Sequence, residues 1–394
     1  MSRWSTFSAF LKEAQSTPEN TRQALVTQLL AERPQFPWIS DLQATFIYRD
    51  SHAQQVALNL DTIPSDPPFA PMQRLAGTDL WHVTREFVAD DLLDYLFAVN
   101  DPMTPLSTDA NLTHRVSQYW KADPLNPLQM KTATFDVSVL RMNHARPFPD
   151  WASFANIPHG NVTEHNLDDE GLDITNRKMW VYTPPQYAER EAMLPVLLIH
   201  DGQWANRQLQ VPAMIDTLIK HGRMQPALVA MLQSDAGEAR NREYLNNPLH
   251  TTFLLEKVIP KLNAEYRVDN TRITTLGVSS GAAASAAAAI AYPEIFSRVA
   301  MISPPLGKGS SSLNELQEAW LNADVLPKRV FQSVGRYEAK GRFYRPAQLL
   351  QANLSKRDDV VYRFIETGSG HGLVGFRGIL PEALVWILPG IAYT

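Results

Sequence analysis

The sequence predicts a two-domain protein in which a small antiparallel β-sandwich precedes an α/β domain with a mostly parallel sheet and helices on both faces. Short strand-like runs separated by Asp, Pro, Ser and Gly fill the first part, which is typical of a sandwich. From Lys178 onward strand-like and helix-like segments alternate, and the middle strands are continuous apolar runs, as in a parallel sheet buried on both faces. A loose region around Phe148 places the boundary, giving domains 1–148 and 149–394.

The first domain is predicted to open with one helix and to continue with short strands. Thr17 and Pro18 indicate a helix start, with threonine as the N-cap and proline at the first helical position. Leucines at helical spacing follow, and the helix ends before Pro34. Strands are expected at residues 44–48, 55–60, 80–84 and 94–99.

The second domain has the alternation of a βαβ architecture, in which a functional site lies at the carboxyl ends of the strands. Strands are expected at residues 179–182, 196–200, 227–232, 273–276, 299–302, 330–333 and 360–365. Helices are expected at residues 211–221, 249–266, 280–292, 313–323, 345–355 and 379–391.

One strand-turn-helix segment has the pattern of a nucleophile elbow. The strand predicted at 273–276 runs into Gly277-Val-Ser279-Ser-Gly281, and an alanine-rich helix follows until Pro293. In such an elbow a sharp turn exposes a serine hydroxyl, and glycines are needed on either side because side chains would collide with the crossing strand and helix. The alternative is an ordinary turn in which the serine is an N-cap. The flanking pattern favours Ser279 as a nucleophile.

A serine nucleophile needs a histidine base and a carboxylate that orients it, in the chain order Ser, acid, His for this kind of fold. His371 is the only histidine after Ser279, and it lies in a glycine-rich loop beyond the strand predicted to end at 365. Glu338 follows the strand predicted at 330–333 and is the first candidate for the acid. Glu366 is closer to His371 in sequence and is the second candidate.

Backbone amides are expected to stabilise the developing oxyanion. One would come from Ser280, directly after the nucleophile, and the other from Gln203 in the loop after the strand predicted at 196–200. Trp204 in the same loop is either a wall of the substrate pocket or a core residue.

Several basic side chains follow strand ends at the same edge of the sheet. Arg240, with Glu243 nearby, either fixes a loop through an ion pair or contacts the substrate. Arg336 and Lys340 surround Glu338 and are either a solvated face or a funnel for an anionic substrate. Arg377 follows His371 and is the remaining candidate for substrate binding.

Composition narrows the possible functions. A formal net charge of −5 gives no general attraction to nucleic acid or anionic membranes. The absence of cysteine excludes disulfides, thiolate metal sites and a cysteine nucleophile, and fits a reducing compartment. The ten histidines show no metal-ligand spacing, the amino terminus is too polar for a secretory signal, and no stretch reaches the ~20 apolar residues of a membrane span. We expect a small-molecule substrate and no metal or cofactor.

The chain resembles the enterochelin (ferric enterobactin) esterases. In the first half the resemblance rests on Gln73-Arg-Leu-Ala-Gly-Thr-Asp-Leu-Trp81 and Asp123-Pro-Leu-Asn-Pro127. In the second half the matching motifs are Asp201-Gly-Gln, Arg240-x-x-Glu243, Gly277-Val-Ser279-Ser-Gly281, Gly335-x-x-Glu338 and Gly370-His371 with Arg377 behind it.

The resemblance implies an immunoglobulin-like domain followed by an α/β-hydrolase domain, with Ser279, Glu338 and His371 as the triad. It also implies cytoplasmic hydrolysis of a catecholate siderophore trilactone, which releases iron. Two alternatives are an esterase for acylated sugars or feruloyl-type esters, and a non-catalytic protein that only binds a ligand.

Overall fold

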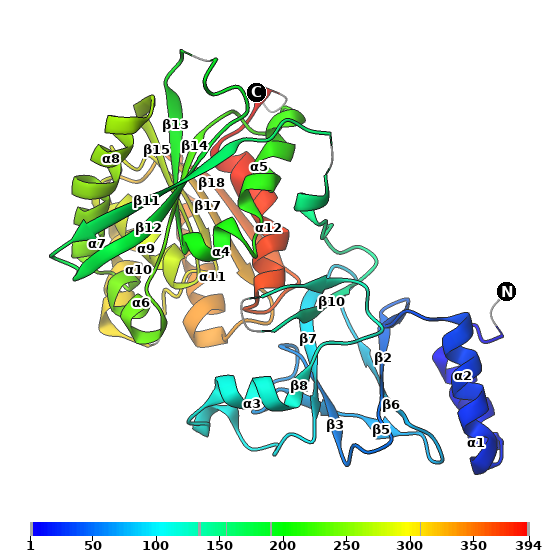
Figure 1. Cartoon of the computed structure of the whole chain (residues 1–394). Helices are drawn as coiled ribbons and strands as arrows, with labels where there is room; N and C mark the ends of the chain where they lie inside the picture. The colour runs from blue at the N-terminus through cyan, green and yellow to red at the C-terminus, as the bar shows by residue number, and fades with distance from the viewer. Residues whose placement is uncertain (1–2, 133–134, 155, 190, 308, 392–394) are drawn as a thin grey trace. The chain divides into compact units, whose positions relative to one another are not determined.

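The structure is a computed structural model, and it describes residues 3–132, 135–154, 156–189, 191–307 and 309–391. Contacts divide the chain into two compact units (Figure 1). The first unit consists of Met1–Pro147 together with Gly368–Gly375, and the second consists of Phe148–Thr367 and Phe376–Thr394. Gly368–Gly375 was expected to belong to the second domain, whereas its contacts group it with the first unit.

The described part of the first unit contains two antiparallel sheets and three α-helices. One sheet has the order β1 (Trp38–Ser40), β2 (Gln43–Arg49), β6 (Leu80–Glu86) and β5 (Gln73–Arg74). The other has the order β4 (Phe69–Pro71), β3 (Val56–Asn59), β7 (Leu92–Val99), β10 (Val137–Arg141) and β9 (Gln129–Met130), and β8 (Trp120–Lys121) also pairs with β7. The helices are α1 (Phe7–Ser16), α2 (Arg22–Glu32) and α3 (Leu112–Tyr119), with 3-10 turns at Glu19–Thr21 and Leu106–Thr108.

Aromatic side chains from the two sheets meet in the core of this unit. The ring centroids of Phe46 in β2 and Tyr95 in β7 lie 4.8 Å apart, and those of Tyr48 and Phe97 lie 5.2 Å apart. The two sheets therefore pack face to face, which confirms the predicted sandwich.

The Asp123-Pro-Leu-Asn-Pro127 motif has a structural role in the sandwich. The Tyr95 hydroxyl donates to Asp123 Oδ2 at 2.7 Å and accepts from Asn126 Nδ2 at 3.0 Å. The Asp123 amide donates to Ser138 Oγ at 2.7 Å. Burial of a carboxyl, a phenol and an amide requires such mutual hydrogen bonds, so this part of the motif specifies the sandwich core.

The second unit is built on an eight-stranded sheet with the order β11-β12-β14-β13-β15-β16-β17-β18. The first two strands pair antiparallel, β12 also pairs antiparallel with β14, and the remaining pairs are parallel. The strands are β11 (Asn161–Asp169), β12 (Ile174–Thr183), β13 (Leu194–His200), β14 (Leu228–Leu232), β15 (Val268–Val278), β16 (Arg298–Ile302), β17 (Arg329–Gly335) and β18 (Val361–Thr367).

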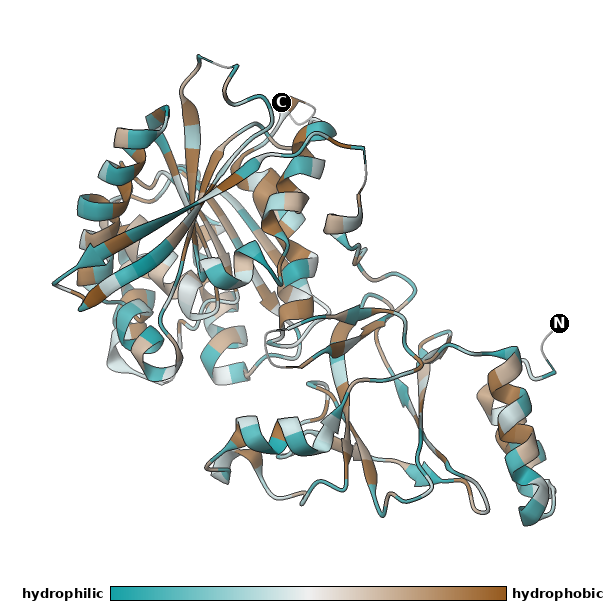
Figure 2. Cartoon of the chain, in the orientation of Figure 1, coloured by the Kyte–Doolittle hydropathy of each residue, from teal (hydrophilic) through white to brown (hydrophobic). Residues whose placement is uncertain are grey.

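Helices cover both faces of this sheet: α5 and α12 lie on one side and α7 and α8 on the other (Figure 1). The central strands are mostly apolar (Figure 2), and every residue of β13 and β14 is buried. The helical elements that accompany this sheet are, in chain order, a 3-10 turn (Trp151–Ser153), α4 (Gly202–Asn206), α5 (Val211–Lys220), α6 (Gly237–Tyr244), α7 (Pro248–Phe253), a π-helical turn (Leu254–Val258), α8 (Ile259–Glu265), α9 (Ser280–Ala291), α10 (Ser311–Asn322), a second π-helical turn (Lys340–Tyr344), α11 (Arg345–Leu354) and α12 (Leu373–Ile387).

The predicted strands and helices of the second unit are present, but the start of the chain differs from the prediction. Thr17 was expected to be the N-cap of one helix, whereas it is the C-cap of an additional helix, α1, and α2 begins only at Arg22. Helix α1 forms because its apolar face, with Phe7 and Phe10, is buried.

The last helix was expected at 379–391, but it begins at Leu373 and contains Pro381 in its interior. Extensive burial of its apolar residues, among them Leu380 and Leu384, outweighs the cost of the proline. Strand β11 was not predicted because most of its side chains are polar and exposed, and it is held by backbone pairing with β12.

Candidate functional site

The segment Gly277 to Gly281 forms the predicted elbow between β15 and α9. Ser279 has φ 55° and ψ −125°, a backbone conformation that residues other than glycine rarely adopt. A Cβ atom on Gly277 would lie 2.0 Å from the backbone oxygen of Gly281, and one on Gly281 would lie 2.7 Å from Asp201 Oδ2. Gly277 is therefore required by the turn, and Gly281 by the close approach of α9 to His200 and Asp201.

The loop after β13 begins with Asp201 in the left-handed conformation, at φ 59° and ψ 48°, and turns at once into α4. A Cβ atom on Gly202 would lie 2.4 Å from the carbonyl oxygen of Met231 in β14, so only glycine lets the backbone pass this close. The Gln203 side chain donates to Ser234 Oγ at 2.8 Å and accepts from the Ser234 amide at 3.1 Å. These two bonds fix the residue whose backbone amide is predicted to stabilise the oxyanion.

Arg240 fixes the same loop through a bidentate ion pair. Its Nε and one terminal nitrogen donate to the two oxygens of Asp201 at 2.6 and 2.7 Å. The guanidinium also lies over the rings of Trp204 and Tyr244, 5.1 and 5.4 Å from their centroids. The sequence suggested Glu243 as its ion-pair partner, but that partner is Asp201. This geometry supports the loop-fixing alternative for Arg240, and its contact with substrate stays a prediction.

Beneath the loop, Glu243 belongs to a buried polar chain. It pairs with Arg177 at 2.9 Å and with His250 Nδ1 at 3.1 Å. His250 Nε2 lies 2.9 Å from His200 Nε2, and His200 Nδ1 lies 2.9 Å from Ser285 Oγ. Burial lowers the pKa of His200 well below its ordinary value, and His250 adds to this effect, so His200 is neutral. A neutral His200 has one ring nitrogen that donates and one that accepts, and its two nitrogens face Ser285 Oγ and His250 Nε2.

Glu338 is 2% exposed and follows β17, as predicted. Its Oε1 accepts from Ser303 Oγ at 2.5 Å and from the Gly335 amide at 2.7 Å. Ser303 follows β16 and has a left-handed φ of 53°. Sequence reasoning did not identify Ser303 as a residue that orients the acid; its position directly after a central strand was the available signal.

Glu366 lies within β18, and both of its oxygens have other donors. Arg336 Nε donates to Oε1 at 3.2 Å, and the Tyr344 hydroxyl donates to Oε2 at 2.6 Å. The exposed Lys340 lies over the Tyr344 ring, 3.7 Å from its centroid, and donates to the Arg336 carbonyl at 2.9 Å. The predicted basic group around Glu338 is thus part of a partly exposed ion-pair cluster.

Arg377 is 6% exposed. Its guanidinium donates to the Pro149 carbonyl and to Gln210 Oε1, and it lies 4.5 Å from the centroid of the Phe148 ring. Contact with a substrate would require Arg377 to break these hydrogen bonds. The geometry therefore favours a structural role for Arg377, in which it holds the segment around Phe148 and Pro149 at the start of the second unit.

His371 lies between β18 and α12, in the segment Gly368–Gly375 that belongs to the first unit. Its backbone amide donates to Asp61 Oδ2 at 3.0 Å. Ser280, the other predicted amide donor, begins α9, and its hydroxyl donates to Asn241 Oδ1 at 3.1 Å. The catalytic roles of His371 and Ser280 stay predictions.

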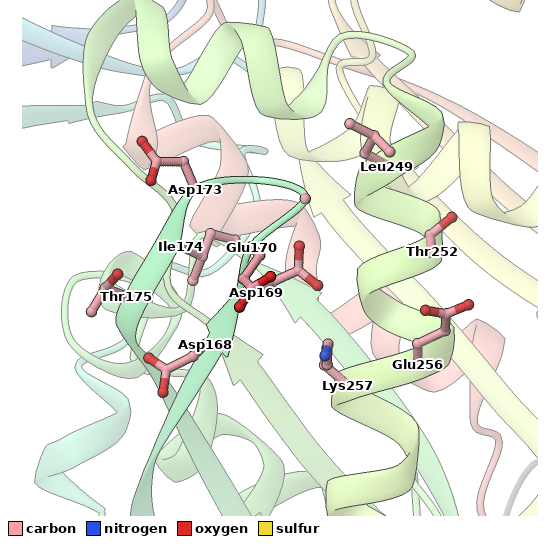
Figure 3. Close-up of a pocket in the computed structure, with 11 residues that line it drawn as sticks. Asp168, Asp169, Glu170, Asp173, Ile174, Thr175, Leu249, Thr252, Glu256 and Lys257 are labelled. Atoms are coloured by element: carbon pink, nitrogen blue, oxygen red, sulfur yellow. The ribbon is translucent and has the colours of Figure 1, made fainter.

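A cavity of about 700 Å³ lies elsewhere in the second unit, beside the turn between β11 and β12 (Figure 3). Asp169 Oδ1 accepts from the Leu172 amide at 2.9 Å, and Asp168 Oδ1 from the Asn176 amide at 2.7 Å, so two of its carboxylates stabilise the hairpin. Its lining includes none of the predicted site residues. Within the described ranges, no group of three acidic or histidine side chains could hold a metal, and no helix is long and apolar enough to cross a membrane.

Two family models match the chain. Residues 174–387 match the model described as "Putative esterase", and residues 43–151 match the N-terminal model of enterochelin esterases. Together they cover the elbow and the sandwich, and they confirm the resemblance drawn from the sequence motifs.

Named relatives and solved structures agree with the family models. The chain is 24% identical to an iron(III) enterobactin esterase of Dickeya dadantii, covering 89% of this chain and 88% of the relative. It is 27% identical to an Escherichia coli O6:H1 protein of the same name, with 80% of each covered. The enterobactin esterase of Shigella flexneri, solved in the presence of enterobactin, has 23% identity and a TM-score of 0.72 over 89% of this chain and 94% of its own. This structural similarity confirms the predicted fold.

The strained conformation of Ser279 predicts an unusual order of stability between two variants. Such strain costs about 1–3 kcal/mol in a residue with a Cβ atom, and glycine relieves it while adding about 0.5–1 kcal/mol of unfolded-state entropy. The free energy of unfolding of Ser279→Gly should therefore be higher than that of Ser279→Ala by about 1 kcal/mol. Denaturant unfolding of the second unit measures this. A glycine variant equal to or less stable than the alanine variant would contradict the strain.

Proposed function

Because the chain belongs to the "Putative esterase" family, we propose that it is a serine esterase that opens the ester bonds of a catecholate siderophore trilactone. The observation that carries the reaction class is Ser279, held at φ 55° between two glycines that admit no side chain. That geometry presents a hydroxyl beyond the end of a central strand, which is what acyl transfer by a serine requires.

In the proposed mechanism, Ser279 Oγ attacks the ester carbonyl while His371 Nε2 takes its proton. The backbone amides of Ser280 and Gln203 stabilise the negative charge that develops on the carbonyl oxygen. The tetrahedral intermediate collapses, and the departing alkoxide receives the proton from His371. Water, deprotonated by the same histidine, then attacks the acyl-enzyme and releases the acid.

Glu338 is the carboxylate that orients His371 in this proposal. Its support is burial and a fixed orientation, since Ser303 and Gly335 both donate to Oε1. Oε2 then accepts from Nδ1–H of the histidine. Glu366 is disfavoured because Arg336 and Tyr344 already bond to its two oxygens.

The substrate class rests on the relatives, which are named iron(III) enterobactin esterases. A ferric tris-catecholate is an anion, so the partly exposed Arg336 and the exposed Lys340 are the basic side chains we assign to substrate binding. Trp204, held under Arg240, is assigned to the wall of the acyl pocket. Iron release in the cytoplasm, which the family resemblance implies, is part of this proposal.

Incubation with iron-free and ferric cyclic catecholate trilactone, followed by mass spectrometry, tests the function. The wild type should open the ring once to give the linear trimer and then cleave the remaining esters to smaller serine conjugates, each ester cleavage adding one water. Ser279→Ala should lower kcat by about 10⁶, because removal of a triad nucleophile leaves only the remaining transition-state stabilisation. Intact trilactone with the wild type, beside rapid cleavage of a feruloyl ester, would favour the alternative substrate class.

Two glutamine variants compare the candidate acids. Glu338→Gln should reduce kcat strongly, by up to about 10⁴, because the amide cannot compensate the histidinium. Glu366→Gln should change kcat by less than about tenfold, since it disturbs only a partly exposed ion pair. Steady-state kinetics on one ester compares both. A larger loss at Glu366 would transfer the role of the acid to that residue.

A further inference from the structure

Three glycines at alternate positions around His371 lie against the sandwich of the first unit. A Cβ atom on Gly368 would lie 2.8 Å from the Asp90 carbonyl oxygen. One on Gly370 would lie 1.8 Å from Asp61 Oδ2, and one on Gly372 would lie 2.3 Å from Asp94 Oδ1. Each distance is too short for a side chain. The repeated glycine around the histidine is therefore explained by close packing of its backbone on the sandwich.

Hydrogen bonds fasten this segment to the sandwich at two points. The Leu92 amide, at the start of β7, donates to the Gly368 carbonyl at 2.8 Å. The amide of His371 itself donates to Asp61 Oδ2 at 3.0 Å. Asp61 follows β3, whereas Asp94 lies within β7, the neighbouring strand.

We propose that Asp61 and Asp94 are positioning residues for the histidine base: Asp61 fixes the backbone of His371 through its amide, and Asp94 packs against the adjacent Gly372. This inference rests on the proposed function, because it assumes that His371 is the base. It gives the sandwich a part in catalysis that is separate from any contact with the substrate.

The charges around the segment fit this role. Burial, and after it the neighbouring Asp61 carboxylate, raise the pKa of Asp94 to about 7, although His371 lowers it in part. Carboxyl groups with perturbed pKa values, such as Asp94, cluster at functional sites. A base must be held close to its reactive geometry, since a displacement of about 1 Å can cost about 10²-fold in rate.

Asp61 is the position at which the proposal is tested, because its exposed side chain can be shortened without opening a core cavity. Asp61→Ala removes the acceptor for the His371 amide, and kcat should fall by about 10- to 100-fold. The KM should change by less than about twofold, because the substrate contacts stay. Asp61→Asn keeps an acceptor oxygen and should restore kcat to within about threefold of the wild type.

Asp50→Ala is the matched control, since Asp50 is another carboxylate of the first unit that accepts from backbone amides, those of His52 and Ala53. It should leave kcat and KM unchanged. The iron-free trilactone is the substrate for all variants, and circular dichroism checks that each is folded. His371→Ala is measured beside them to test the proposed function separately.

The outcomes separate the two proposals. Full activity of His371→Ala would overturn both. An inactive His371→Ala beside an Asp61→Ala with wild-type kcat would overturn the positioning role alone. A rise in KM at unchanged kcat would also overturn it and assign Asp61 to substrate binding instead. Failure of Asp61→Asn to recover activity would show that the hydrogen bond to the histidine amide is not the cause.

Discussion

The turn at Ser279 is the constraint on which the site of the second unit depends. It is possible because Gly277 has no side chain where β15 crosses into α9, and because Gly281 has none where α9 approaches His200 and Asp201. The alanines of α9 extend the same condition, since ten of its residues are buried and the helix contacts both β15 and β16. The strained backbone of Ser279 lowers the stability of the fold and holds the serine hydroxyl in a fixed position. Such strain is common at catalytic sites.

The groups proposed to act with this serine are held in place by hydrogen bonds or ion pairs to neighbouring polar residues. The loop that carries Gln203 is held by the ion pair between Arg240 and Asp201, Glu338 is held by Ser303, and the His371 amide is held by Asp61. The deeper chain through His200 and His250 supports the strand that precedes the loop. Such supporting bonds reduce the reorganisation needed during reaction, which is how fixed dipoles stabilise a transition state better than water does.

The sequence predicted the parts that depend on local patterns. Alternation of apolar strands and helices identified the sheet, and the two glycines identified the elbow. It did not predict β11, whose polar side chains give no strand signal, or the early start of α12, where burial overrides Pro381. It also missed the support of His371 by Asp61, because contacts between residues 310 positions apart leave no local pattern. For Arg240 the ion pair was considered, but its partner Asp201 could be found only in three dimensions.

The central claim is that Ser279 is a nucleophile activated by His371, and covalent labelling measures this without knowledge of the natural substrate. A fluorophosphonate should modify the wild type once, and peptide mapping should place the adduct on Ser279. The labelling rate should fall by about 10²- to 10⁴-fold in His371→Ala, the usual contribution of a general base. An adduct on another residue, or labelling of His371→Ala at the wild-type rate, would contradict the account.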